Sequence, residues 1–366
     1  MSKAAYPPRS RLILGSTLGL FMTGATGAAV GAVLPQWQLD FGVRGELSWY
    51  FNLLFAGAAV GILLSSRMRR RHPWLSLALL SEGVGLGILA LTPEVWGIFG
   101  GAFLLGIGVA IANFHCNALP LDLYPTGHAV VLNRVGAAFG IGAVLAPLLM
   151  VGLPWRLAYG LLAGVALVAA ALLWKAPPPP APSPPQSSAP QGLLLHVLGA
   201  TMAYVSAELV VSSFSGLYLR HLGYDPPLVG VLLSLFWVAF TLGRLGLAPL
   251  LAEQPLARLL GLHLLALGVA LVYSIPPLAW AFPLLGFLLA PTFPTLYSFA
   301  REAIGPHSAT YLFYAGAVGA NLIPAAFAWM PQGALGLGML GAVGWMTLAT
   351  YFLRRRHEAS SSALRP

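Results

Sequence analysis

The chain has 366 residues, of which 58% are hydrophobic and only 8% are charged, and its mean hydropathy is +0.81. A soluble protein of this size could not bury so much apolar surface, so the composition excludes a soluble globular class. The single cysteine, Cys116, excludes a disulfide framework and a cysteine-rich metal site.

Twelve apolar segments follow one another along the chain, and each is long enough for a helix that crosses a bilayer, which takes about 20 residues. Because backbone groups in lipid must be satisfied within their own segment, the spans should be helices. The sequence therefore predicts an all-α membrane protein with twelve transmembrane helices in two six-helix halves. We expect the spans near 12–35, 47–65, 74–92, 96–119, 128–152, 156–174, 192–219, 228–250, 256–275, 277–299, 308–329 and 332–353.

An uncharged, Pro-rich stretch separates the two halves. Its sequence, APPPPAPSPPQSSAPQ, is typical of an extended linker because proline cannot continue a helix. We expect an N-terminal half over 1–175, a cytoplasmic linker over 176–191, and a C-terminal half with a basic tail over 192–366.

Lysine and arginine residues concentrate on one side of the predicted membrane. With twelve spans, fifteen of them fall on the side that holds both termini and the linker, and three fall on the other side. The positive-inside rule then predicts a multi-pass protein of the cytoplasmic (inner) membrane with both termini in the cytoplasm. The net charge of +9 is explained by this topology and by contact with anionic membrane lipid, so it requires no nucleic acid.

A weak internal repeat relates the two halves. At an offset of 179 residues, His128 aligns with His307 and Gly140 aligns with Gly319. Both pairs fall at or in the fifth predicted span of their half. Two related six-span halves are a feature of secondary transporters.

Glu208 is the only acid that we expect near the membrane centre, where a charge is costly unless it faces the bundle interior or a water-filled cavity. Tyr204, Ser212 and Ser215 recur at helical spacing on the same face of the seventh span. Burial disfavours the charged form of a carboxyl, which suits a group that binds and releases a proton during transport. The alternative is a structural acid that hydrogen-bonds between helices.

Other polar side chains on the predicted spans could line a substrate cavity. Amide groups on the fourth span could bind a hydroxylated ligand, although they could equally join helices. A tryptophan on the eighth span could stack on a sugar ring. It could equally pack in the core or against lipid. The cavity candidates are Tyr204, Ser212, Asn113, Asn117, Trp237, Thr241, Tyr314 and Asn321.

Four charged residues are candidates for gate or structural roles. Arg244, at the cytoplasmic end of the eighth span, could pair with an acid or with a helix C-terminus. Glu82 and Arg134 enter their spans to a similar depth, and an ion pair between them would lower the cost of both. Asp122 could pair with the basic cluster over 67–71.

No sequence pattern of an enzyme occurs in the loops, which are short. The glycine patterns lie within apolar spans and follow no strand, so they are packing features and not nucleotide-binding loops. We therefore expect no enzymatic activity, no catalytic residues, no cofactor and no bound metal.

Several stretches resemble the major facilitator superfamily and, within it, the fucose/glucose/galactose permease family of sugar:proton symporters. YVSAEL at 204–209 and LSLFWVAFTLGR at 233–244 are similar to that family's seventh and eighth helices. NALPLDLYP, LNRVGAAFGIGAVLAP and APTFPTLYSFA resemble its fourth, fifth and tenth helices. The resemblance implies the twelve-helix fold and proton-coupled sugar transport. The loop SSRMRRRHP keeps only the basic part of the usual superfamily loop motif.

The leading interpretation is a secondary transporter that moves a small polar solute by alternating access, with a sugar as the favoured class and a proton as the coupling ion. One alternative is an exporter of apolar drugs or metabolites, and another is a membrane receptor or scaffold that does not transport. We expect a monomer whose partners are the solute, the proton and membrane lipid.

Overall fold

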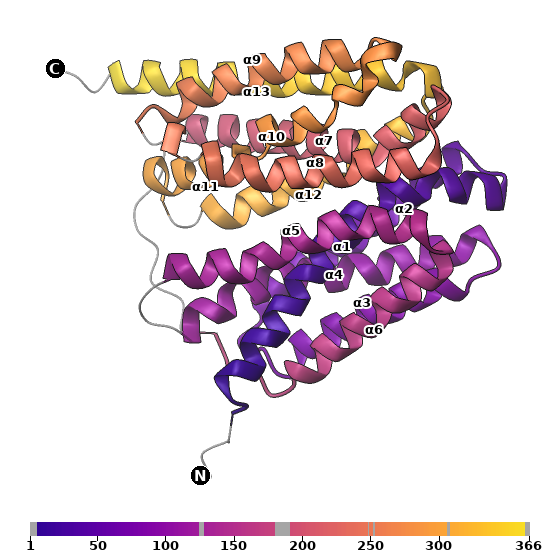
Figure 1. Ribbon diagram of the computed structural model, residues 1–366. Coiled ribbons are helices and arrows are strands. Elements are labelled where there is room, and N and C mark those ends of the chain that lie inside the picture. Colours follow the sequence, from indigo (N-terminus) through magenta and orange to yellow (C-terminus); the bar gives the residue numbers. More distant parts are fainter. Residues whose placement is uncertain are drawn as a thin grey trace. The chain divides into compact units, whose positions relative to one another are not determined.

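The computed structural model describes residues 6–123, 128–179, 191–247, 249–251, 253–305 and 308–362. Over these ranges the chain is helical and contains no strand. It divides into two compact units, a first unit of Met1–Pro182 and a second unit of Ser183–Pro366 (Figure 1).

The first unit contains six helices. They are α1 (Arg9–Phe41), α2 (Ser48–Arg67), α3 (Trp74–Leu91), α4 (Val95–Leu123), α5 (His128–Gly152) and α6 (Trp155–Leu172), with a short η1 (Gly45–Leu47) before α2. α1 packs against α5, α2 packs against α4, and α3 packs against both α4 and α6. α1 ends at Gly42, whose left-handed backbone (φ 67°) favours glycine.

The second unit contains seven helical segments. They are α7 (Gln191–His221), α8 (Pro226–Leu247), α9 (Pro255–Tyr273), α10 (Pro283–Leu289), α11 (Thr292–Ala303), α12 (Ser308–Phe327) and α13 (Leu335–Ser362), with 3-10 turns η2 (Pro249–Leu251), η3 (Pro276–Ala281) and η4 (Gln332–Ala334). α7 packs against α12 and α13, α8 packs against α10, and α9 packs against α13.

The tenth expected span, over 277–299, is broken in the structure. η3 occupies its start, and α10 and α11 are separated at Ala290 and Pro291. Proline has no backbone N–H, and its ring clashes with the carbonyl four residues earlier, so the helix cannot run through Pro291 unchanged. The two pieces still form one apolar span, Pro283–Ala300.

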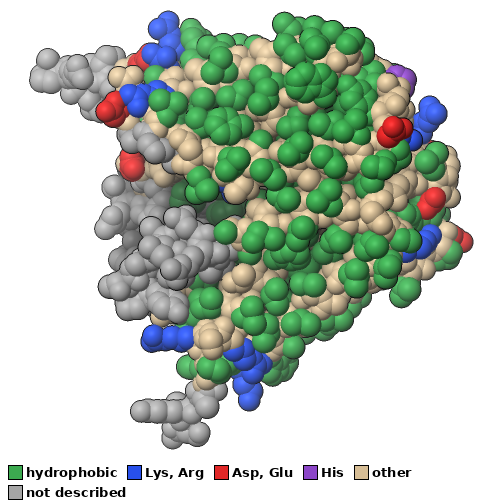
Figure 2. Space-filling model, in the orientation of Figure 1, with side chains coloured by type: hydrophobic (Ala, Val, Ile, Leu, Met, Phe, Trp, Pro, Cys, Tyr) green, Lys and Arg blue, Asp and Glu red, His purple; other side chains and the backbone are tan. Residues whose placement is uncertain are grey.

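The expectation of twelve spans is confirmed. Ten helical segments of the described chain, the broken tenth span among them, are long and apolar enough to cross a membrane. Two shorter apolar helices, Ala137–Gly152 and Tyr311–Phe327, complete the set. On the face that Figure 2 shows, hydrophobic side chains cover the region between the helix ends, and most charged side chains gather at the ends.

Glycines allow close backbone contact between α2 and α4 in the first unit. A Cβ atom on Gly106 would lie closer than 3.0 Å to the carbonyl oxygen of Leu54. A Cβ atom on Gly61 would also lie closer than 3.0 Å to the carbonyl oxygen of Ile107. A larger residue at either position would push the two helices apart.

The second unit repeats this contact between α8 and α10. A Cβ atom on Gly286 would lie closer than 3.0 Å to the Phe236 carbonyl oxygen, and one on Gly243 would lie closer than 3.0 Å to the Phe287 carbonyl oxygen. Both contact residues on α8 follow their counterparts on α2 by 182 positions, and both on α10 follow theirs on α4 by 180. The two units therefore share one pattern of close glycine contacts between helices, at the same positions in each unit. We call this pattern the packing frame.

The fifth helix of each unit makes a further shared contact. Gly142 of α5 abuts the Phe21 carbonyl of α1, and Gly319 of α12 abuts the Met202 carbonyl of α7. The structural counterpart of Gly319 is thus Gly142, two residues after the Gly140 expected from the sequence repeat. The offset at this helix is 177 and not 179.

The structure describes residues at both ends of the expected linker. Ala176 is buried in the hydrophobic core of the first unit, and the Pro177 carbonyl accepts a hydrogen bond from Nη1 of Arg71 at 3.4 Å. Gln191 is the first residue of α7. The remaining expected linker residues, 180–190, lie outside the described part of the chain.

Candidate functional site

Glu208 lies near the middle of α7, as the eighteenth of its 31 residues. Its side chain is partly exposed and interacts electrostatically with the Tyr204 hydroxyl and the Arg244 guanidinium. The Tyr204 hydroxyl is buried and has no hydrogen-bond partner of normal geometry among the described residues. This cluster therefore brings a carboxyl, a phenol and a guanidinium close enough to affect one another.

Arg244 reaches this cluster from the neighbouring helix. It lies in the last turn of α8, is exposed, and places its guanidinium 4.6 Å from the centre of the Phe240 ring. Because α7 and α8 pack against each other, the acid and the base belong to adjacent helices of one unit. Glu208 is an acid of the kind expected near Arg244, and the gate role of Arg244 stays a prediction.

The aromatic candidate on α8 is enclosed by other rings. Trp237 is buried and makes edge-to-face contacts with Phe236 and Phe240, at ring-centre distances of 5.2 and 5.3 Å. The Thr241 hydroxyl donates to the Trp237 carbonyl at 2.9 Å. These contacts favour packing over sugar stacking for Trp237.

The other candidates of the second unit differ in accessibility. The Ser212 hydroxyl is buried and donates to the Leu209 carbonyl of its own helix at 3.4 Å. Asn321 is buried within α12, whereas Tyr314, two turns earlier on the same helix, is partly exposed. Tyr314 is therefore better placed than Asn321 to meet a solute.

The two asparagines of α4 form a pair in the first unit. Nδ2 of Asn117 donates to the backbone carbonyl of Asn113 at 2.7 Å and to its Oδ1 at 3.1 Å. Both side chains are partly exposed. Their remaining amide donors and acceptors are available to a polar ligand.

Glu82 lies deeper than its expected position. It is the ninth of the 18 residues of α3, so Glu208 is not the only acid near the middle of a span. Glu82 is fully buried, and neither carboxyl oxygen has a partner in the described structure. The expected pair with Arg134 finds no support, because α3 packs against α4 and α6 while α5 packs mainly against α1. The side chain of Arg134 lies outside the described part of the chain.

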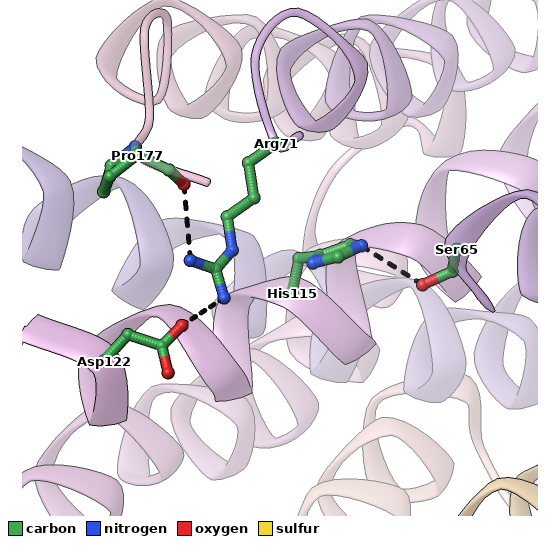
Figure 3. Close-up of polar contacts among 5 residues, drawn as sticks. All are labelled: Ser65, Arg71, His115, Asp122 and Pro177. Atoms are coloured by element: carbon green, nitrogen blue, oxygen red, sulfur yellow. Dashed lines mark hydrogen bonds and ion pairs between the residues drawn. The ribbon is translucent and has the colours of Figure 1, made fainter. Parts of the chain in front are cut away.

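Asp122 forms an ion pair with one arginine of the basic cluster, Arg71 (Figure 3). Arg71 is almost fully buried, and its side chain points between Asp122 and the Pro177 carbonyl. His115 lies beside this group and hydrogen-bonds to Ser65 at 3.2 Å through Nε2. The cluster joins the α2–α3 loop, the end of α4 and the first residues after α6.

A buried histidine in the second unit was not among the residues predicted from the sequence. His263 is fully buried in α9, with Nδ1 3.1 Å from Oγ1 of Thr350 and Nε2 3.0 Å from Oγ1 of Thr292. The signal in the sequence was a lone histidine within an apolar span, but its partners come from α11 and α13. Within the described part of the chain, no group of three or more His, Cys, Asp or Glu could hold a metal ion.

Comparison with known proteins decides the family. The family model described as Major Facilitator Superfamily matches residues 16–328. The chain belongs to this superfamily. No curated protein matches the chain.

Solved structures of major facilitator transporters share the fold. A bacterial homologue of the human lysosomal transporter Spinster, in an inward-facing and unoccupied conformation, has 16% identity and a TM-score of 0.74, over 96% of this chain and 97% of that one. A D-xylose–proton symporter has 14% identity and a TM-score of 0.73, over 94% and 97% of the two chains. The POT family transporter PepTSo has 12% identity and a TM-score of 0.73, over 97% and 99%. At these identities the likeness establishes the fold alone.

In a major facilitator protein, a mid-span acid beside a guanidinium can exist in two states. A carboxylate attracts Arg244, and a protonated carboxyl does not. Protonation of Glu208 would remove this attraction between α7 and α8. Such a change is what coupling between proton binding and helix movement requires.

Proposed function

We propose that this major facilitator protein is a secondary active transporter that moves a small polar solute across the cytoplasmic membrane and couples it to protons through Glu208. The observation that carries the proposal is the cluster of Glu208, Tyr204 and Arg244 in the middle and last turns of adjacent helices. A carboxyl, a phenol without a hydrogen-bond partner and a guanidinium together can exchange a proton and bind hydroxyl oxygens.

The coupling follows from charge. When Glu208 is ionised, Arg244 stabilises it, and both groups are engaged with each other. When Glu208 takes a proton, the attraction is lost, and the guanidinium can donate to a solute oxygen while the Tyr204 hydroxyl adds another donor. The protonated and solute-bound state then carries no unpaired carboxylate through the membrane, which lowers the cost of the conformational change.

A sugar is the favoured class of solute. The partly exposed candidate groups are the amides of Asn113 and Asn117 in the first unit and the Tyr314 phenol in the second, and groups of these kinds suit a ligand rich in hydroxyls. Because Trp237 is enclosed by Phe236 and Phe240, recognition would rest on hydrogen bonds and not on stacking.

The resemblance to fucose/glucose/galactose permeases supports the same class. The alternative functions are an exporter of apolar compounds and a membrane receptor or scaffold without transport. The apolar composition of the spans is compatible with both. The partly exposed acid and guanidinium favour a polar, proton-linked solute over either alternative.

Uptake into proteoliposomes separates the three functions. Vesicles that contain the purified protein are tested with labelled hexoses, pentoses, nucleosides and dipeptides, with and without an acidic exterior. We expect one polar class to accumulate above its external concentration only when the pH gradient is present. Extrusion of an apolar dye without polar uptake would indicate an exporter, and no flux of any compound would indicate a receptor or scaffold.

The proposed orientation has a separate test. A reporter inserted at Ser183 should be cytoplasmic, and one inserted near Asp225 should lie outside, since fifteen Lys and Arg residues fall on the side of the termini and three on the other. The opposite location of either reporter would contradict the topology while leaving the transport proposal intact.

A further inference from the structure

An open groove lies on the surface of the first unit between α3 and α6. It has a volume of about 370 Å³ and is lined by Arg11, Ser76, Leu77, Leu80, Leu167, Ala170, Ala171 and Trp174. The large apolar residues of this set are exposed. The three leucines lie on helices long and apolar enough to cross a membrane, so the groove opens toward lipid.

The groove combines an apolar floor with one cation at its end. Arg11 donates to the carbonyl oxygens of Leu172 and Ala171, at 3.0 Å from Nε and 2.6 Å from Nη2. A guanidinium has five N–H donors, so three are left for which the described residues supply no partner. Ser76 also lines the groove, and its buried hydroxyl has no partner there either.

Two exposed tryptophans mark the depth of this end of the groove. Trp74 begins α3, and Trp174 follows the end of α6. Tryptophan at a helix end is typical of the boundary between hydrocarbon and head groups. Arg11 contacts the last turn of α6 and therefore lies at head-group level. Leu80 is six residues beyond Trp74, so the groove extends about 9 Å into the hydrocarbon at 1.5 Å per residue.

We infer that this groove binds one anionic phospholipid, with its phosphate on Arg11 and an acyl chain along Leu80 and Leu167. An arginine pairs with phosphate through more than one N–H, which gives geometry as well as attraction. Two further exposed cations lie nearby. Arg9 is close to Arg11 in the chain, and Lys175 follows the end of α6, which Arg11 contacts. These cations favour a lipid with net negative charge over a zwitterionic one. The inference rests on the membrane fold and not on the proposed transport activity.

A second groove at the other end of α3 provides an internal contrast. It has a volume of about 510 Å³ and is lined by Val84, Gly87, Ile88, Leu91 and Thr92. No charged residue lines it, and the Thr92 hydroxyl is already bonded to the Glu94 carbonyl at 2.7 Å. This groove should hold lipid chains without selection for the head group.

Native mass spectrometry of the full-length protein tests the site. The protein is reconstituted in vesicles of equal phosphatidylglycerol and phosphatidylcholine, extracted in mild detergent and examined for retained lipid. We expect one retained phosphatidylglycerol per chain. Arg11→Ala should lower its retention relative to phosphatidylcholine about tenfold, the factor for loss of a charge-assisted hydrogen bond.

Three further variants separate the site from general effects. Leu80→Trp fills the groove without changing Arg11 and should lower retention of both lipids, whereas Val84→Trp fills the second groove and should leave the retained phosphatidylglycerol. Arg220→Ala is a control, because it removes another arginine that donates to a backbone carbonyl, that of Tyr224 at 2.7 Å. It should have no effect on the retention of either lipid. Retention of phosphatidylglycerol that is unchanged in both Arg11→Ala and Leu80→Trp would overturn the inference. If Arg11→Ala does not fold, Leu80→Trp alone decides.

Discussion

The third helix of each unit carries a buried ionisable residue at the same position, yet the surroundings of the two differ. Glu82 is the ninth residue of α3, and His263 is the ninth residue of α9. Both ring nitrogens of His263 are hydrogen-bonded to threonine hydroxyls, whereas neither oxygen of Glu82 has a partner within the described chain. The packing frame is repeated between the units, and the polar contacts are not.

The register of the glycine contacts explains the missing partners. Positions on α10 and α11 follow those on α4 by 180, so the counterpart of Thr292 is Ala112. With the first residues of α6 and α13 taken as equivalent, the counterpart of Thr350 is Ala170. Both alanines are buried. The first unit therefore supplies no hydroxyl at the places where the second unit uses two.

The largest expected effect comes from a side chain added where α1 packs closely against the backbone of α5. A Cβ atom on Gly24 would lie closer than 3.0 Å to the Phe139 carbonyl oxygen, whereas Gly27 on the same helix has nothing within 4 Å. Gly24→Ala should cost about 3 kcal/mol of unfolding free energy or prevent folding. Gly27→Ala should change it by about 0.5 kcal/mol or less. Thermal unfolding in detergent measures both, and equal effects would contradict the frame.

The second unit gives the matching pair with the glycine on the other helix. Gly319→Ala should be severe, because its Cβ would clash with the Met202 carbonyl. Gly316→Ala should be mild, because its nearest neighbour is Cγ2 of Val205 at an ordinary 3.5 Å. A mild Gly319→Ala with a folded, stable protein would show that α7 and α12 can separate without cost.

Removal of the histidine should have the next largest effect. His263→Leu leaves the hydroxyls of Thr350 and Thr292 without their partner, at a cost of about 1–3 kcal/mol. The triple variant that also carries Thr292→Val and Thr350→Val should recover part of the loss, since no hydroxyl then lacks its partner. Failure of the threonine changes to restore any thermal stability would show that the loss comes from packing alone.

The equivalent change in the first unit should act in the opposite direction. Glu82→Met keeps a similar size and removes two buried oxygens that lack partners, so it should raise the unfolding free energy by about 1 kcal/mol. Glu82→Gln is the control, because it keeps the polar atoms and should give no gain. A loss of stability in Glu82→Met would mean that the carboxyl has a partner after all.

The smallest effect is expected at the linker. Replacement of residues 180–190 by a Gly/Ser run of equal length should leave thermal stability and transport near normal, because the sequence there has no large apolar side chain. Ala176→Asp places a charge in the core of the first unit and should be destabilising. A severe loss from the Gly/Ser replacement, with normal expression, would indicate a specific role for the Pro-rich stretch.

Hydropathy alone predicted the twelve spans, because lipid forces long apolar helices on the chain. The sequence also has Pro291 within the tenth expected span, which is a signal for a break. Because the apolar run is continuous there, an unbroken span was expected. The depth of Glu82 was misjudged, although the span over 74–92 already placed it near the middle. These features depend on neighbouring residues and can be derived from the sequence.

The contacts between distant segments could not be derived in this way. The sequence offered Arg134 as a partner for Glu82, yet the helix order in the unit places α5 against α1 and not against α3. Arg71 and not another arginine of its cluster pairs with Asp122, because it alone of them is buried at the end of α4. The approach of Arg244 to Glu208 likewise depends on how α7 and α8 cross.

The proton-coupling role of Glu208 is tested most directly by comparing Glu208→Gln with Glu82→Gln in proteoliposomes. Each variant keeps a mid-span polar side chain and removes one ionisable group. We predict that Glu208→Gln still exchanges solute across the membrane but no longer accumulates it under a pH gradient, whereas Glu82→Gln accumulates it normally. Accumulation that survives Glu208→Gln and is lost in Glu82→Gln would contradict the account and assign the coupling to the first unit.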